Sequence, residues 1–219
     1  KALEKEGVKE VFGLPGGANL PMYDELYKSN IRHILVRHEQ SAAHMADGFG
    51  RVSRKPGVCF ATSGPGATNL LTGIATAQAD SAPMVAVTGQ VPVAMIGRDA
   101  FQESDIIGMA NPSVKYSYQP RTPEEIPQIV KQGFYIAETG RPGPVLLDIP
   151  KDVQQNEAKF TFPDEVRVPG YHPWTDPDIP SIEKAIELLL SAEKPIILAG
   201  GGVIISSAFA ALQSIAEML

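Results

Sequence analysis

The chain has 219 residues, a formal net charge of −6 at pH 7 from 19 basic and 25 acidic side chains, and a single cysteine. No run of basic residues occurs, so a nucleic-acid or anionic-membrane surface is not indicated. No apolar stretch reaches the roughly 20 residues that span a bilayer, and one cysteine cannot form a disulfide within the chain. We therefore expect a soluble, intracellular protein, with small-molecule chemistry left open.

Residues 1–7 have the pattern of the last turns of an amphipathic helix that stops at Gly7. We expect the chain to begin and end within elements, as a fragment, so the lack of a signal or transit peptide carries no information. Apolar, β-branched runs then alternate with helical patterns. The predicted strands are residues 8–14, 31–36, 58–62, 84–88 and 145–149. The predicted helices are residues 20–28, 40–52, 68–79 and 124–138.

This alternation is typical of βαβ units. The predicted strands are apolar at nearly every position, which favours a parallel sheet that helices cover on both faces. The sequence thus predicts an α/β fold with a doubly wound parallel sheet. In such sheets ligands bind beyond the carboxyl ends of the strands, where residues 14–19, Glu39 and residues 62–69 are all expected.

A change of composition follows the first domain. The next residues are rich in proline, charged and aromatic side chains, and a helix at 181–191, a strand at 195–199 and the turn Gly200-Gly201-Gly202 come after them. We therefore assign residues 1–152 to the first domain, 153–180 to an interdomain connection that lies against it, and 181–219 to the start of a second α/β domain.

Glu39 stands where a predicted strand ends and a helix of small residues begins. One interpretation is structural, because a carboxylate in the first turn of a helix stabilises the helix dipole by up to about 1 kcal/mol. The other is functional, because a glutamate that apolar neighbours shield at such a junction can exchange a proton with a bound heterocycle. The residue alone leaves both open.

Two glycine-containing loops accompany Glu39. Gly16 and Gly17 fit either a tight turn or the close approach of a ligand to the main chain. The second loop, residues 63–69, combines two glycines and a proline with the hydrogen-bonding groups of Ser63, Thr68 and Asn69 near a helix N-terminus. A cap and a turn need fewer special residues, so this loop favours a binding site.

Other site patterns do not occur in the sequence. Gly200-Gly201-Gly202 lacks the G-x-G-x-x-G spacing of a dinucleotide-binding turn, and neither a P-loop nor a G-x-S-x-G nucleophile elbow is present. The histidines are too scattered to propose a metal site. They are His33, His38, His44 and His172. We predict no metal site within this chain.

Several motifs carry a family resemblance. In order and spacing, FGLPGG (12–17), RHEQSAAHMADGFGR (37–51), TSGPGATN (62–69) and GQVP (89–92) resemble the pyrimidine-binding domain of thiamine-diphosphate enzymes. Within that superfamily, IGRDAFQE (96–103) and GRPGPVLLDIPKDVQ (140–154) resemble the catalytic large subunit of acetolactate synthase, or acetohydroxyacid synthase. The likeness covers essentially the whole chain.

The resemblance implies roles for the matching residues. Glu39 matches the glutamate that bonds the aminopyrimidine ring nitrogen of thiamine diphosphate, where proton exchange promotes removal of the thiazolium C2 proton. Gly17, with Gly16, matches a loop whose backbone approaches the reacting centre. The matches to the pyrimidine pocket are Ser63, Pro65 and Asn69, and those to the substrate channel are Phe101, Gln102 and Lys151. The catalytic assignment falls on Glu39, Gln102 and Gly17, and Gln102 is also assigned to cofactor binding.

Two further cofactors are implied. Arg141 matches an arginine that contacts FAD, and Gly201 and Gly202 resemble the start of the FAD-holding central domain, whose flavin is structural. Without the resemblance, Arg141 fits equally well as a surface arginine that caps the preceding helix. The family's diphosphate and Mg²⁺ segment is missing from this chain, so we place Mg²⁺ in a C-terminal domain and expect the fragment alone to be inactive.

The resemblance also implies partners and an activity. The family's active site lies between two subunits, so we expect a homodimer that acts on 2-oxo acids, with a regulatory small subunit as a further partner. The full enzyme would decarboxylate pyruvate on thiamine diphosphate and condense the hydroxyethyl carbanion with pyruvate or 2-oxobutyrate. This is the first common step of branched-chain amino acid biosynthesis. We expect a cytoplasmic location, or an organelle if a transit peptide precedes the chain.

Three alternatives remain open at this point. A sister thiamine-diphosphate enzyme, such as pyruvate oxidase or sulfoacetaldehyde acetyltransferase, would share the motifs. A non-catalytic binding or regulatory module would keep the fold without the chemistry, and the presence of Glu39 argues against it. A nicotinamide-dependent oxidoreductase is the weakest alternative, because its glycine spacing does not occur.

Overall fold

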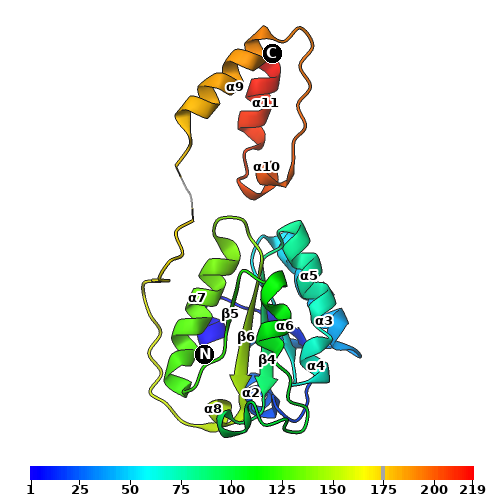
Figure 1. Ribbon diagram of the computed structural model, residues 1–219, viewed down its shortest axis with the longest axis vertical. Coiled ribbons are helices and arrows are strands. Elements are labelled where there is room, and N and C mark those ends of the chain that lie inside the picture. Colours follow the sequence, from blue (N-terminus) through cyan, green and yellow to red (C-terminus); the bar gives the residue numbers. More distant parts are fainter. Residues whose placement is uncertain (174–175) are drawn as a thin grey trace. The chain divides into compact units, whose positions relative to one another are not determined.

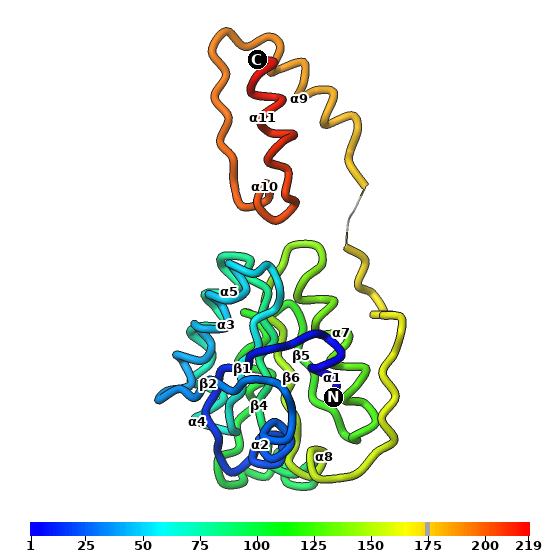
Figure 2. The backbone as a smooth tube through the Cα atoms, turned by 180° about the vertical axis from the view of Figure 1, so that it is seen from behind, coloured from blue at the N-terminus to red at the C-terminus, as the bar shows by residue number. Residues whose placement is uncertain are grey.

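A computed structural model describes residues 1–173 and 176–219 (Figure 1, Figure 2). The chain divides into two compact units, the first comprising Lys1–Pro173. The division lies inside the predicted connection 153–180, and residues 174 and 175 of that connection are outside the described residues.

The first unit, whose residues are all described, contains one parallel sheet. Its six strands are β1 (Glu10–Gly13), β2 (Arg32–Leu35), β3 (Gly57–Ala61), β4 (Met84–Gln90), β5 (Tyr116–Tyr118) and β6 (Pro144–Pro150). Their order across the sheet is β2-β1-β3-β4-β6-β5, and each neighbouring pair is parallel. The sheet therefore has all its carboxyl ends at one edge, towards which the arrowheads of β4 and β6 point in Figure 1.

Helices connect the strands and cover both faces. They are α1 (Ala2–Lys5), α2 (Leu20–Tyr27), α3 (Glu39–Ser53), α4 (Pro65–Thr68), α5 (Leu71–Asp80), α6 (Ile106–Ala110), α7 (Ile126–Glu138) and α8 (Lys151–Gln155), with 3₁₀ turns at Val93–Met95, Asn111–Ser113 and Pro123–Glu125. One core cluster joins the sheet to α1, α2 and α7, and the other joins it to α3, α5 and α6. The predicted doubly wound α/β fold is confirmed.

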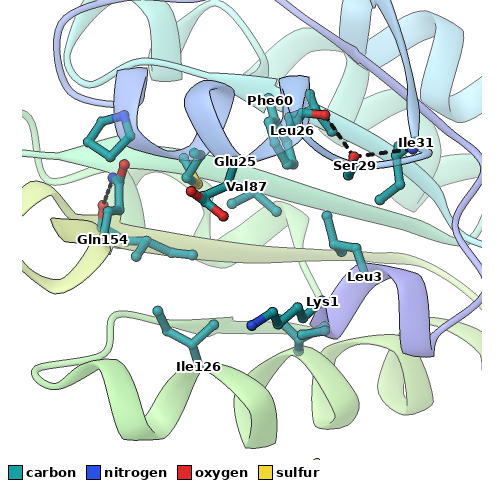
Figure 3. Close-up of a pocket in the computed structure, with 15 residues that line it drawn as sticks. Lys1, Leu3, Glu25, Leu26, Ser29, Ile31, Phe60, Val87, Ile126 and Gln154 are labelled. Atoms are coloured by element: carbon teal, nitrogen blue, oxygen red, sulfur yellow. Dashed lines mark hydrogen bonds between the residues drawn. The ribbon is translucent and has the colours of Figure 1, made fainter. Parts of the chain in front are cut away.

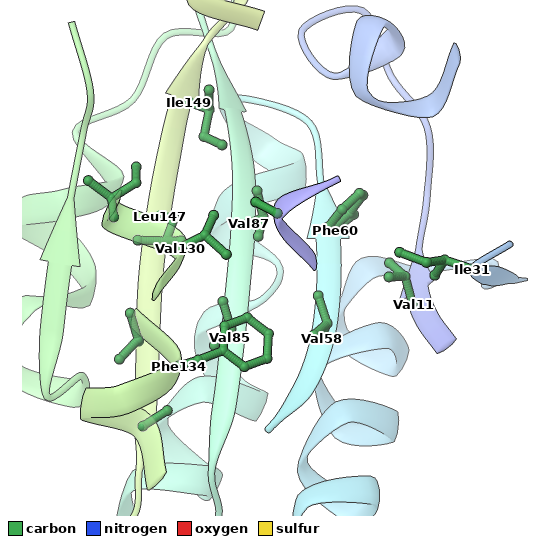
Figure 4. Packing of buried hydrophobic residues seen from close by; sticks show 14 of the residues in the cluster. Val11, Ile31, Val58, Phe60, Val85, Val87, Val130, Phe134, Leu147 and Ile149 are labelled. Carbon is green, nitrogen blue, oxygen red and sulfur yellow. The ribbon is translucent and has the colours of Figure 1, made fainter. Parts of the chain in front are cut away.

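The central strands are mostly apolar because alternate side chains enter different cores. Val58 of β3 belongs to the cluster on the α7 face and the next residue, Cys59, to the other. Figure 4 shows Val85 and Val87 of β4 together with Phe134 of α7 in the first cluster. Apolar side chains thus cover both faces of the sheet, as expected for a buried parallel sheet.

Small residues allow α3 to pack closely against β3 and α5. A methyl carbon at Gly57 of β3 would collide with the carbonyl of Ala46, and one at Gly73 of α5 would collide with the Ala43 side chain. The helix therefore lies in direct contact with β3 and α5. This close packing places Glu39, the first residue of α3, at the carboxyl edge of the sheet.

Two predicted elements are wrong, and one strand was not predicted. The predicted helix 68–79 is two helices, α4 and α5, with a turn between them. Strand β5 was not predicted, because its sequence, Tyr-Ser-Tyr, is short and polar in the middle. The predicted strand 195–199 is not a strand: the described residues after 175 offer no neighbouring strand to pair with, and Ile196 and Leu198 are 93% and 97% exposed.

The described residues beyond 175 form three helices, α9 (Ile179–Ser191), α10 (Gly201–Ile205) and α11 (Phe209–Met218). Within the first unit, Phe162, Val168 and Tyr171 of the predicted connection pack on the core, and Gln132 donates to the Arg167 carbonyl at 2.9 Å. Among the residues that the structure describes, every helix is too short or too polar to serve as a membrane span.

Candidate functional site

Three of the predicted site segments lie side by side at the carboxyl edge of the sheet. The loop with Gly17 follows β1, Glu39 comes shortly after β2, and residues 62–64 follow β3, and these three strands are neighbours in the order β2-β1-β3. Figure 1 shows α2 and α4 at this edge. The topology therefore brings together side chains that are distant in the sequence.

Glu39 contacts a second predicted site residue. Its side chain is only 7% exposed, and Asn69, the C-cap residue of α4, donates from Nδ2 to Glu39 Oε2 at 2.9 Å. His38 serves as the N-cap of α3, where its Nδ1 accepts from the Gln40 N–H at 3.2 Å. Glu39 is thus not needed as a cap, and within the described residues its Oε1 takes no hydrogen bond.

Gly66 lies close to the Glu39 carboxylate. A methyl carbon at Gly66 would lie 3.2 Å from Glu39 Oε1 and 2.7 Å from Thr62 Cγ2. Thr62 also supports the first loop, since its Oγ1 accepts from the Ala18 N–H at 3.1 Å. Beside it, Gly17 has nothing within 4 Å of the position of a Cβ. The edge therefore offers exposed backbone at Gly17 next to a shielded carboxylate.

The remaining predicted pocket residues belong to the loop after β3. Ser63 is 3% exposed, and its carbonyl accepts from the Gly66 N–H at 3.3 Å. Pro65 is exposed and opens α4, where its fixed φ suits the first helical position. The structure thus places Ser63, Pro65 and Asn69 on one loop and helix beside Glu39.

The predicted channel residues Phe101 and Gln102 lie on the loop after β4, which touches this group. A methyl carbon at Gly64 would lie 2.5 Å from the Gln102 carbonyl oxygen, so the two loops are in contact. Phe101 is 88% exposed. Glu103 accepts from the Gly97 and Ala100 N–H groups, and these backbone donors lower the pKa of its carboxyl.

Lys151 also lies at the carboxyl edge of the sheet, where it follows β6. It is the half-buried first residue of α8, directly after β6. In the same helix, Gln154 Nε2 donates to the carbonyls of Ala18 at 2.8 Å and Ile149 at 2.7 Å. The helix that carries Lys151 is therefore held to the loop that carries Gly17.

Arg141 is not part of this arrangement, and Gly201 and Gly202 belong to the second unit. Arg141 precedes β6, at the opposite edge of the sheet, and its guanidinium donates to Ser81 Oγ at 2.7 Å and to the carbonyls of Gln78 at 3.3 Å and Ala79 at 3.0 Å. It thus caps the C-terminus of α5, whereas the sequence suggested the preceding helix. Gly201 and Gly202 are exposed residues that begin α10 of the second unit.

The sequence interpretation missed a buried polar network below the edge. Asp148 of β6 is fully buried and accepts from Thr88 at 2.7 Å, from Gln90 at 3.0 Å and from Gln119 at 2.7 Å. Burial raises the pKa of the Asp148 carboxyl to about 6, against the effect of these three donors. An aspartate within the apolar strand β6 was the available signal.

Across residues 1–173 and 176–219, the structure places no three histidine, cysteine, aspartate or glutamate side chains where they could hold a metal ion. A largely apolar cavity of about 260 Å³ lies on the α7 face, between α1, α2 and α7 (Figure 3). Its lining includes Leu3, Leu26, Phe60 and Val87 but none of the predicted site residues.

Comparison with known proteins gives a family for the first half of the chain. Residues 1–109 match the family described as thiamine pyrophosphate enzyme, N-terminal TPP binding domain. The probable acetolactate synthase large subunit of Methanocaldococcus jannaschii is 57% identical over 222 residues, covering 100% of this chain and 38% of the relative. The acetolactate synthase large subunit of Corynebacterium glutamicum is 51% identical over 218 residues, covering 99% and 35%. The acetolactate synthase of Mycobacterium bovis is 49% identical over 219 residues, covering 100% and 35%. The chain thus spans well under half the length of these relatives.

Proposed function

Residues 1–109 belong to the thiamine pyrophosphate enzymes as an N-terminal TPP binding domain, and on this premise we propose that the chain is part of an acetolactate synthase catalytic subunit. The complete enzyme decarboxylates pyruvate, releases CO₂ and joins the remaining two-carbon unit to a second 2-oxo acid, pyruvate or 2-oxobutyrate. The product is a precursor of branched-chain amino acids.

The observation that carries the proposal is the shielded carboxylate of Glu39. Asn69 engages Oε2 and leaves Oε1 available among the described residues, in a setting where Gly66 could not carry a side chain without meeting Thr62. This geometry fits an aminopyrimidine, whose ring nitrogen pairs with a carboxyl oxygen. When bound, thiamine diphosphate would supply a thiazolium ring whose carbon adds to the substrate carbonyl and whose positive charge takes up the electron pair left behind when CO₂ departs.

The residues of the chain bind and orient this group. Glu39 holds or releases a proton at the pyrimidine ring nitrogen, as general acid–base chemistry requires of a carboxyl within hydrogen-bonding reach. Gly17 leaves room for a close approach to the backbone. Pocket walls come from Ser63, Pro65 and Asn69, and the substrate channel comes from Phe101, Gln102 and Lys151.

Further partners belong to the same proposal. Mg²⁺ binds with the cofactor diphosphate in a part of the protein that this chain does not include. FAD binds to the second domain, with Arg141, Gly201 and Gly202 as contacts. A second copy of the subunit covers the carboxyl edge, and the 88% exposure of Phe101 supports this, because a large apolar side chain there favours burial. A regulatory small subunit completes the assembly.

The test uses the full-length protein with thiamine diphosphate, Mg²⁺ and FAD. Pyruvate should be converted to acetolactate, detected as acetoin after acid treatment, and Glu39→Gln should lose this activity by about 10²–10⁴-fold. Glu25→Gln is the matched control, because this carboxyl on α2 is exposed and pairs with Lys28 at 2.6 Å.

Other products would overturn the assignment. Acetyl phosphate made from pyruvate with consumption of oxygen, or sulfite released from sulfoacetaldehyde, would indicate one of the sister enzymes. A Glu39→Gln variant with full acetolactate synthesis would remove Glu39 from the chemistry. Loss of activity in Glu25→Gln as well would show that the assay reports folding alone.

A further inference from the structure

The loop of residues 93–105, which carries Phe101 and Gln102, is closed by its own hydrogen bonds. Glu103 Oε1 accepts from the Gly97 N–H and Oε2 from the Ala100 N–H at 2.9 Å. The Glu103 N–H in turn donates to the Ala100 carbonyl at 2.9 Å. These bonds join the middle of the loop to its end, so they depend on the points that attach the loop to the sheet and keep both parts in place.

Two attachment points hold the ends of this loop. At its start, the Val93 N–H donates to both carboxylate oxygens of Asp152 at 3.1 Å. At its end, the Ser104 carbonyl accepts from Gln90 Nε2 at 3.0 Å. The second point lies only two residues from Gln102, so it governs the part of the loop that meets Gly64.

Gln90 is a rigid anchor. It is 3% exposed at the last position of β4, and its Oε1 accepts from the Val91 N–H at 2.9 Å. The same Nε2 that holds Ser104 also donates to Asp148 Oδ2 at 3.0 Å. With both ends of the amide engaged, a flipped amide would lose every one of these bonds.

Asp148 braces this amide from the strand on its far side. It is fully buried in β6, next to β4 in the sheet, and Thr88 and Gln119 fix its carboxylate with bonds of 2.7 Å each. A satisfied buried network of this kind has one arrangement. The position of the Ser104 carbonyl is thereby set by the core of the sheet.

We propose that Gln90, braced by Asp148, is a positioning residue that holds the 93–105 loop where Phe101 and Gln102 meet the site. The inference rests on the proposed function, since that function assigns these two residues to the channel. Gln90 acts through the Ser104 carbonyl and does not touch substrate or cofactor.

The test compares two buried substitutions in the full-length protein. Gln90→Met keeps the length of the side chain but removes both donors, so amide hydrogen exchange at Gly97, Ala100 and Glu103 should accelerate by about 10-fold or more. Thr88→Val is the matched control: it removes another bond to Asp148 in the same strand and leaves Gln90 in place. Exchange in the loop should then change by less than about threefold.

Kinetics provide the second measurement. For Gln90→Met, kcat/KM with pyruvate should fall by about 10- to 100-fold, since small misplacements of site residues have effects of this size. Thr88→Val should stay near the wild-type value. Asp148→Asn should also keep most activity, because its amide oxygen can still accept from Gln90 and Gln119 while its NH₂ group donates to the Thr88 hydroxyl.

The outcomes separate this inference from the proposed function. Unchanged loop exchange in Gln90→Met would overturn it, whatever reaction the protein catalyses. Faster exchange with unchanged kinetic constants would also overturn it, because the position of the loop would not matter to the site. If the wild-type protein makes no acetolactate, the proposed function fails, while the exchange comparison still decides whether Gln90 holds the loop.

Discussion

Replacing Gly64 by alanine should damage both the stability of the first unit and the contact between its two site loops. Gly64 has φ 58° and ψ −121°, a backbone conformation that is essentially restricted to glycine. A methyl carbon there would lie 2.5 Å from the carbonyl oxygen of Gln102, which is backbone and cannot rotate away. Two independent costs therefore act at one position.

Their size can be estimated from the two mechanisms. A strained backbone conformation costs about 1–3 kcal/mol. Overpacking of a tight contact costs about another 1–3 kcal/mol, unless the neighbouring loop moves. Gly64→Ala should therefore lower the free energy of unfolding by about 2–6 kcal/mol, a large share of the roughly 5–15 kcal/mol that is typical of a domain.

Urea unfolding followed by circular dichroism measures this change. Gly48→Ala is the control, since Gly48 lies in the interior of α3 with nothing within 4 Å of its Cβ position, and alanine there should stabilise the helix by about 0.5–1 kcal/mol. If Gly64→Ala lost less than about 1 kcal/mol, the contact between Gly64 and the Gln102 loop would not exist as described.

Three further predictions concern charge and cofactors. The raised pKa of Asp148, about 6 against an ordinary 3.8, makes its contribution to stability greatest below pH 4 and progressively smaller up to pH 6. In urea titrations, the free energy of unfolding of Asp148→Asn should therefore rise relative to that of the wild type by up to roughly 3 kcal/mol as the pH increases from 4 to 7. A difference between the two proteins that stays constant with pH would contradict this. Arg141→Ala should lose about 1 kcal/mol by uncapping α5 and, in the full-length enzyme, bind FAD about 5- to 150-fold more weakly in fluorescence titrations. Unchanged FAD affinity would leave Arg141 only its capping role. In calorimetry the 219-residue chain should bind thiamine diphosphate and Mg²⁺ only weakly, and a micromolar affinity would contradict our division of the cofactor site.

The sequence predicts well the elements whose own residues carry a clear pattern. Strands β3 and β4 are buried on both faces, so an unbroken apolar run identifies them. Strand β5 escapes this rule because it is partly exposed at the sheet edge and exists through its pairing with β6. The apolar run 195–199 fails for the converse reason: the described residues after 175 give it no strand to pair with.

The same distinction applies to the site. The junction of a strand and a helix places Glu39 at the sheet edge, and that could be predicted locally. Its bond to Asn69 joins residues 30 positions apart, and the bond between Gln90 and Asp148 joins residues 58 apart. Such contacts depend on how the elements pack, which no local pattern records. A polar residue inside an apolar strand indicates that it has a hydrogen-bonding partner, but not which residue that partner is.

The exchange of the C2 proton of thiamine diphosphate bound to the full-length enzyme, followed by NMR, tests the role of Glu39 directly. A Glu39 carboxyl that serves the pyrimidine ring predicts exchange at least about 100-fold slower in Glu39→Gln than in the wild type, with Glu25→Gln unchanged. Exchange at the wild-type rate in Glu39→Gln would show that the shielded carboxylate at the start of α3 does not activate the cofactor.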